Sequence, residues 1–192
     1  MEPKVRDLIL STYQCATVSE SASLYEALVT MDATRKMFQR WDYRPRILLV
    51  YDEKQHMVGT LRHYDILQTL EPRYKEFGEL PRLAGLGLNT DFIKSIYSQF
   101  ELWSRPLRDL CVKALQHQVK DIMRIPSDNE YIDVETPIGE AIHRMLMGNH
   151  PSLLVTDSTG FLGILRMSDV ANHVINEMKK LGAPSDPKQK TY

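Results

Sequence analysis

The stretch GTLRHYD at residues 59–65 occurs a second time, as GILRMSD at residues 163–169. Both copies open with glycine, carry Leu-Arg at the third and fourth positions, and end in aspartate. Three further blocks recur in the same order: VRDL at 5–8 with VKDI at 119–122, LYEAL at 24–28 with IGEAI at 138–142, and LLVYD at 48–52 with LLVTD at 153–157. Four matched blocks in one order indicate an internal duplication.

Each copy has the residue pattern of a small α/β unit. In the second copy, residues 131–134 favour a strand, and Thr136-Pro137 marks a helix start with proline at the first helical position. The apolar run at 152–155 predicts a buried strand, and residues 161–166 predict the next strand after a turn. A helix from Asp169 closes the unit. The predicted order is β-α-β-β-α in both copies, which are expected to pack as a pair because each core is small.

The overall composition is that of an ordinary globular protein. The chain has 192 residues and a formal net charge of −1, so the charge balance does not point to nucleic acid or to a membrane surface. No apolar run approaches the roughly 18 residues that a membrane-spanning helix needs, and residues 1–10 lack the apolar centre of a signal peptide. Cys15 and Cys111 have no paired spacing, which favours a reduced, cytoplasmic protein with both thiols packed inside; a disulfide between them is the alternative.

The repeated unit resembles the CBS domain, which is named for cystathionine β-synthase and usually occurs as tandem pairs. The resemblance covers residues 5–70 and 119–178. It is carried by the VRDL and VKDI blocks, by the apolar runs that end in Asp52 and Asp157, and by the glycine-led blocks. It implies two repeats packed through their sheets, with two clefts between them for an adenosine-containing ligand such as AMP, ADP, ATP or S-adenosylmethionine.

By this resemblance, Asp65 and Asp169 accept hydrogen bonds from the ribose hydroxyls. The family motif has Thr or Ser three residues before this aspartate, where this sequence has Arg62 and Arg166. A guanidinium at a strand end, beside a helix N-terminus, predicts a bidentate grip on phosphate. Two neighbouring side chains are candidates for further phosphate donors: His63 and Ser168.

An alternative use of the two arginines remains open. Each arginine then pairs with its own aspartate or stacks on the partner repeat, and the clefts stay empty. The adenine is expected against apolar strand residues, with the main chain near the start of the next strand reading its edge. By resemblance these positions are Val18, Ile132, Ile47 and Pro151. All four are equally expected as core residues.

Between the repeats lies a segment too long for a plain linker. We divide the chain into a first repeat at 1–70, a helical insert at 71–118, a second repeat at 119–181 and a disordered tail at 182–192. Residues 89–91 mark one helix start in the insert, and Pro106 opens a second helix. These helices either cover a sheet of their own module or form a dimer or partner surface through an aromatic stripe of Phe92, Ile93, Ile96, Tyr97 and Phe100, with Trp103.

The sequence contains no recognised catalytic or metal-binding pattern. Its histidines are scattered, and the spacings of zinc sites, phosphate loops and nucleophile elbows are absent. We therefore expect a non-enzymatic regulatory module that binds an adenine nucleotide, signals by a change of conformation, forms a homodimer and acts on an unidentified protein target. The alternative is a ligand-free scaffold that assembles through its insert, and a nucleotide-dependent enzyme is the least favoured hypothesis.

Overall fold

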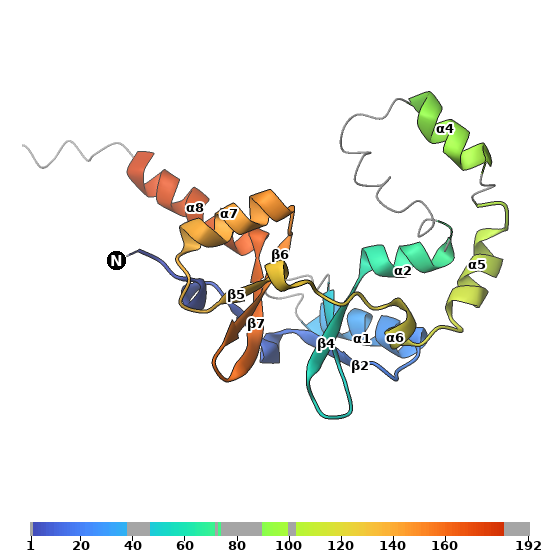
Figure 1. Ribbon diagram of the computed structural model, residues 1–192, viewed down its shortest axis with the longest axis horizontal. Coiled ribbons are helices and arrows are strands. Elements are labelled where there is room, and N and C mark those ends of the chain that lie inside the picture. Colours follow the sequence, from blue (N-terminus) through green and yellow to red (C-terminus); the bar gives the residue numbers. More distant parts are fainter. Residues whose placement is uncertain (1, 38–46, 72, 74–89, 100–102, 183–192) are drawn as a thin grey trace, which may run out of the picture. The chain divides into compact units, whose positions relative to one another are not determined.

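The computed structural model describes residues 2–37, 47–71, 73, 90–99 and 103–182 (Figure 1). The chain divides into two compact units. One is formed by Ala16–Ile125, and the other by Met1–Cys15 together with Pro126–Tyr192. We call them the first-repeat unit and the second-repeat unit, after the repeat that supplies most of each sheet.

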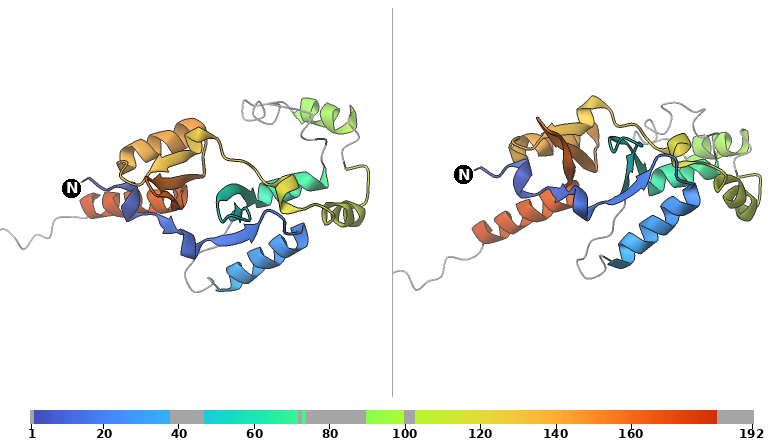
Figure 2. Two further views of the ribbon diagram at one scale, coloured as in Figure 1. Left: turned by 60° about the horizontal axis from the view of Figure 1, so that its bottom comes forward. Right: turned by 90° about the horizontal axis from the view of Figure 1, so that it is seen from below.

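In the first-repeat unit, three strands form a mixed sheet in the order β2-β3-β4. β2 (Ala16–Ser19) runs parallel to β3 (Ile47–Tyr51), and β4 (Met57–Arg62) runs antiparallel to β3. α1 (Leu24–Met37) makes the crossover that a parallel pair requires and runs alongside β2 (Figure 2). α2 (His63–Leu70) follows β4. The predicted order β-α-β-β-α is confirmed.

The second-repeat unit has the same order and one additional strand. β5 (Tyr131–Asp133), β6 (Ser152–Asp157) and β7 (Gly160–Arg166) repeat the arrangement of β2, β3 and β4. β1 (Leu10–Ser11) adds to the sheet antiparallel to β7, which gives the order β1-β7-β6-β5. α7 and α8 pack against each other (Figure 1). Their bounds are Ile138–Gly148 and Met167–Gly182.

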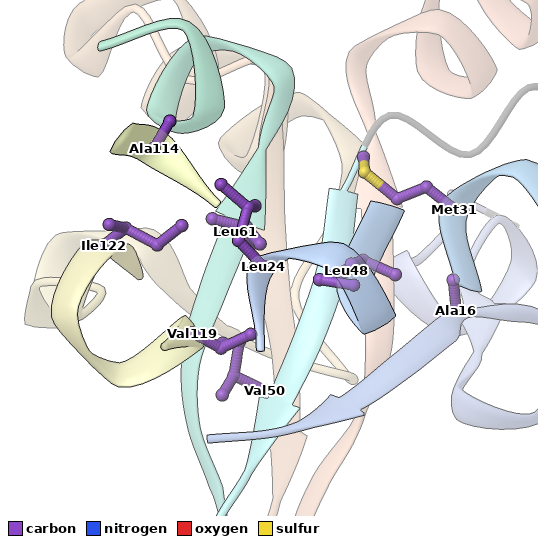
Figure 3. Close-up of a cluster of buried hydrophobic side chains, with 10 residues drawn as sticks. Ala16, Leu24, Met31, Leu48, Val50, Leu61, Ala114, Val119 and Ile122 are labelled. Carbon is purple, nitrogen blue, oxygen red and sulfur yellow. The ribbon is translucent and has the colours of Figure 1, made fainter. Parts of the chain in front are cut away.

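Each unit has its own apolar core between its sheet and its helices. In the first-repeat unit, Leu24 of α1, Leu48 of β3 and Leu61 of β4 point toward one another (Figure 3). In the second-repeat unit the core contains Leu153, Val155 and Leu165. Because successive residues of a strand face opposite sides of the sheet, their neighbours face away from the helices. We call this second side the outer face of the sheet; its residues include Leu49, Thr60, Leu154 and Ile164.

The segment that leads into each repeat packs in the unit named after the other repeat. Val5 is fully buried in the core of the second-repeat unit, and its N–H donates to the carbonyl of Thr136 at 2.9 Å. Val119 is fully buried in the core of the first-repeat unit, and its N–H donates to the carbonyl of Ala22 at 2.8 Å. Both segments are short helical turns, a 3₁₀ turn at Val5–Asp7 and α6 at Val119–Ile122. The two compact units therefore do not follow chain order.

This exchange explains why glycine opens each of the repeated blocks. A Cβ at Gly163 would lie 2.1 Å from the carbonyl oxygen of Leu10 in β1. A Cβ at Gly59 would lie 2.7 Å from Sδ of Met123, the residue that follows α6. In the second-repeat unit the main chain of the exchanged segment leaves no room for a Cβ at this position, and in the first-repeat unit the side chain of Met123 would have to move to make room.

The insert contributes α4 (Thr90–Gln99) and α5 (Leu107–Ala114), which begin where the helix-start patterns predict. α5 contacts α2, and Ala114 belongs to the core of the first-repeat unit. The side chains of Ile93, Ile96 and Tyr97 and the whole of Phe100 lie outside the described residues, so the aromatic stripe stays a prediction. The tail at 183–192 also lies outside them.

A buried carboxylate at the start of the insert bonds to Arg73 and to Trp103, which lies further along the insert. Glu71, which follows α2, is 2% exposed and accepts hydrogen bonds from Nε and Nη2 of Arg73 at 2.6 and 2.7 Å. It also accepts the backbone N–H of Trp103 at 2.9 Å. These hydrogen bonds lower the pKa of Glu71 although burial opposes the shift, and the bond from the Arg73 side chain has the largest effect.

Candidate functional site

In the first-repeat unit, β4 ends and α2 begins at the predicted arginine–aspartate pair. Asp65 is 7% exposed, and its Oδ2 accepts the backbone N–H of Arg62 at 2.8 Å. The side chain of Arg62 closes a bidentate ion pair, with Nε to Oδ2 and Nη2 to Oδ1 both at 3.0 Å. The carboxylate thus caps the first turn of α2, beginning at His63, and holds the guanidinium at the strand end.

The second-repeat unit forms the same pair between β7 and α8. Nε and Nη2 of Arg166 donate to Asp169 at 2.5 and 2.6 Å. The side chain of Asp169 is 24% exposed, so this carboxylate is more open to solvent than that of Asp65. α8 begins at Met167, whose N–H donates to the carbonyl of Pro151 at 3.0 Å.

Both arginines therefore adopt the local pairing that the sequence left open as the alternative to phosphate contact. The two uses are compatible, because the bond to Asp65 takes two of the five N–H groups of the Arg62 guanidinium. A carboxylate oxygen that accepts one hydrogen bond from a guanidinium retains a second lone pair as an acceptor. A ligand that offers both hydroxyls and phosphate matches such a pair.

Two of the residues predicted to read the adenine edge lie beside these pairs. Ile47 is the cross-strand partner of Arg62, and Pro151 bonds to the residue that follows Arg166. The structure thus brings each of them to the strand end that carries the arginine. An adenine contact by their main chains stays a prediction.

Val18 and Ile132 lie elsewhere. Val18 is the partner of Val50 and packs against the core of the first-repeat unit, and Ile132 is 1% exposed in the core of the second-repeat unit. Both side chains are on the helix side of their sheets, so they contribute to packing. The structure does not bring Val18 beside Arg62, which pairs with Ile47 at the other end of β3.

The two candidate phosphate donors are both exposed. His63 is the first residue of α2, and Ser168 is the second residue of α8. His63 comes one residue after Arg62 and Ser168 two residues after Arg166, and both lie in the first turn of a helix. Their position is accessible to a ligand, and their role stays a prediction.

The two cysteines are free thiols in different environments. Burial raises the pKa of Cys15 to about 12, and the nearby positive charge of Arg166 opposes this shift. The thiol of Cys15 donates to the carbonyl of Ser11 at 3.4 Å. Cys111 is exposed on α5, so the expectation that both thiols are packed inside is wrong for Cys111. The adjacent Leu110 faces the core instead, since it lies one residue earlier on the helix.

Sequence reasoning missed Thr60, the second residue of the first repeated block. Thr60 is 1% exposed, and its hydroxyl oxygen is buried without a hydrogen-bond partner. The second copy has Ile164 at this position. The polar-for-apolar difference between the two copies was the available signal.

Among the described residues, no group of three or more metal-binding side chains is close enough to hold an ion. In that same part of the chain, no helix is long and apolar enough to cross a membrane.

Comparisons with known proteins agree with this architecture. A model of the CBS domain matches residues 5–72 and 119–176. A CBS domain-containing protein of unknown function from Bacillus anthracis superposes with a TM-score of 0.59 at 16% identity, over 91% of this chain and 94% of that chain. The CBS-pair protein CBSX2 from Arabidopsis thaliana gives 0.59 at 19% identity, over 93% and 99%. A structure of CBSX2 in complex with AMP gives 0.54 at 19% identity, over 90% and 97%. Comparison with curated protein sequences gave no match.

Proposed function

This chain belongs to the CBS domain family, and we propose that it is a regulatory module that binds an adenine nucleotide and signals by a change of conformation. The observation that carries the proposal is the arginine–aspartate pair at the end of β4 and again at the end of β7. CBSX2, which has a similar fold, has been crystallised with AMP. In our proposal the ligand is AMP, ADP, ATP or S-adenosylmethionine.

The chemistry of each pair fits the two ends of a nucleotide. Asp65 and Asp169 accept from the ribose hydroxyls, each charge-assisted bond contributing about 1.5–3 kcal/mol. Arg62 and Arg166, with His63 and Ser168 as further donors, bind phosphate through N–H groups that the aspartates do not use. The main chain near Ile47 and Pro151 faces the adenine edge, and Val18 and Ile132 support the strands from the core side.

A thermal-shift titration with AMP, ADP, ATP and S-adenosylmethionine tests this proposal. A ligand at 100 times its dissociation constant stabilises the folded protein by about 2.7 kcal/mol, which raises the Tm of a chain of this size by about 5–10 °C. Such a rise with one nucleotide identifies the ligand. No rise with any of them would leave the ligand-free scaffold as the better account, because the local ion pairs then have a purely structural role.

The regulatory role requires a partner to receive the signal. We propose a homodimer that acts on a protein target, with α8 supplying the dimer surface. Ile175, Met178 and Leu181 are exposed at intervals of three residues and so lie along one side of this helix. Met178→Glu is expected to lower the dimer fraction in light scattering, whereas a wild-type protein that is monomeric at all concentrations would refute the dimer.

We also propose that the protein is cytoplasmic and that it is not an enzyme. Free thiols at Cys15 and Cys111 fit a reducing compartment. CBS pairs are typically regulatory, and the sequence has none of the spacings of a phosphate loop or a nucleophile elbow. Hydrolysis of ATP by the purified protein, lost in Asp65→Asn and Asp169→Asn variants, would refute the non-enzymatic role.

A further inference from the structure

The hydroxyl of Thr60 is a buried polar group without a hydrogen-bond partner. The main chain of Thr60 is satisfied, since its N–H donates to the carbonyl of Arg124 at 2.9 Å and its carbonyl accepts from Arg124 at 2.8 Å. Its Oγ1 has no hydrogen-bond partner, although the residue is only 1% exposed. Buried hydroxyls in folded proteins are nearly always bonded, because leaving one unbonded costs its lost hydration. This oxygen is therefore a position where a polar ligand atom is favourable.

The strand geometry places this hydroxyl on the same face as the arginine of the proposed site. Thr60 and Arg62 are two residues apart on β4, so both lie on the outer face, opposite the core residue Leu61. The cross-strand partners of Thr60 are Leu49 and Arg124. The outer face of the first-repeat unit thus carries a hydroxyl and two arginines within one neighbourhood.

The residues equivalent to Thr60 and its two cross-strand partners are all apolar in the second-repeat unit. Ile164 stands where the first unit has Thr60, and it is fully buried. Its partners across the sheet are Leu154 on β6 and Leu10 on β1, in place of Leu49 and Arg124. Both units keep the arginine of the motif, and only the first adds a hydroxyl and a second cation beside it.

We propose that the first-repeat unit holds the anionic group of the ligand, with Thr60 Oγ1 donating to a phosphate oxygen beside Arg62. Thr60 is then a specificity-determining residue that favours a phosphate-bearing ligand over uncharged adenosine. A hydroxyl donor and a guanidinium are complementary to phosphate, and Arg124 adds positive charge to the same face. This inference rests on the proposed nucleotide-binding function and assigns unequal roles to its two halves.

The test compares Thr60→Val with Ile164→Val by isothermal titration calorimetry, using adenosine and AMP on the full chain. Valine keeps the shape of threonine and removes the hydroxyl. Thr60→Val is expected to weaken AMP binding about tenfold, the loss of one bond to a charged group, and to change adenosine binding by less than about threefold. The matched control Ile164→Val is expected to leave both affinities within about threefold of wild type, because it removes no polar contact.

The outcomes separate this inference from the proposed function. A wild-type protein that binds neither adenosine nor AMP, and that shows no rise in Tm with ADP, ATP or S-adenosylmethionine, overturns both. A wild-type protein that binds AMP, with Thr60→Val binding it equally well, overturns only the role of Thr60, and equal losses for adenosine and AMP overturn the phosphate contact. In the absence of ligand, Thr60→Val is expected to unfold at the same or a higher Tm, since it removes an unbonded hydroxyl. A lower Tm would show that the hydroxyl bonds within the protein.

Discussion

The first-repeat and second-repeat units share their strand order, their helix positions and their arginine–aspartate pairs, yet they differ on the outer faces of their sheets. In the first unit Thr60 and Arg124 are neighbours, and in the second unit Ile164 and Leu10 take their places. Asp65 is more buried than Asp169 and also caps the backbone of Arg62. Leu49 and Leu154 are the same residue on this face, so the difference between the units is concentrated at the positions of Thr60 and Arg124.

Residues on both faces of each sheet are buried. Helix-side residues such as Leu48 and Leu153 fill a close-packed space, where a change of one methylene is destabilising. Thr60 and Ile164 on the outer face are equally buried, so a hydroxyl at this position is favourable only where a partner bonds to it. The differences between the units are therefore the place to look for unequal functions.

The largest effect is expected where a strand passes closest to a glycine. Gly163→Ala should destabilise the protein by about 3 kcal/mol, because its Cβ would collide with the main chain of Leu10 and push β1 off β7. Urea unfolding measures this loss. Gly59→Ala is the matched variant and should cost less, since its Cβ meets the flexible side chain of Met123. A Gly163→Ala variant as stable as wild type would contradict the exchange of the lead segments.

The two cysteines should differ in reactivity by about 100-fold. At pH 7.5 a thiol with a pKa of about 12 is almost entirely protonated, so Cys15 should react slowly with maleimide, whereas the exposed Cys111 should react at once. Mass spectrometry after brief labelling identifies the modified residue. Labelling in urea should modify both, and equal rates in the folded protein would contradict the burial of Cys15.

The two aspartates should differ in their contribution to ligand binding. Asp65→Asn is expected to weaken AMP binding by at least about tenfold, because it removes a charged acceptor for the ribose hydroxyls and releases Arg62. Asp169→Asn should have a smaller effect if the first-repeat unit holds the phosphate. Calorimetric titration of both variants measures the difference. Unchanged affinity in both variants would refute the ribose assignment.

The smallest effect is expected at Glu71, the buried carboxylate of the first unit. The second copy has the exposed Ile175 at the equivalent sequence position. Glu71→Gln should lower stability at pH 7 by about 1 kcal/mol, because it weakens the bonds to Arg73 and Trp103. The pKa of Glu71 is lowered in the folded protein, so this stabilisation is present above the ordinary carboxylate pKa and is lost as pH falls through the folded value. Stability curves of the variant and wild type should therefore converge in acid. Parallel curves would contradict the role of the charge.

The sequence predicted those features that depend on near neighbours along the chain. The repeated blocks predicted the duplication, the apolar run ending at Asp52 predicted the buried strand β3, and the pattern at 89–91 predicted the start of α4. The arginine–aspartate pair also follows from spacing, since residues three apart at a helix start are within reach of each other. The sequence could only present this pair as one of two alternatives.

Tertiary structure alone decided which parts of the chain belong together. The matching blocks at 5–8 and 119–122 gave no sign that Val5 packs with the second repeat and Val119 with the first, because main-chain hydrogen bonds to Thr136 and Ala22 carry no side-chain signature. The burial of the Thr60 hydroxyl could not be predicted from the sequence either, since threonine is common in strands and its burial depends on its cross-strand neighbours. Periodicity fixes which face a residue lies on, and only the packing of distant segments fixes what that face meets.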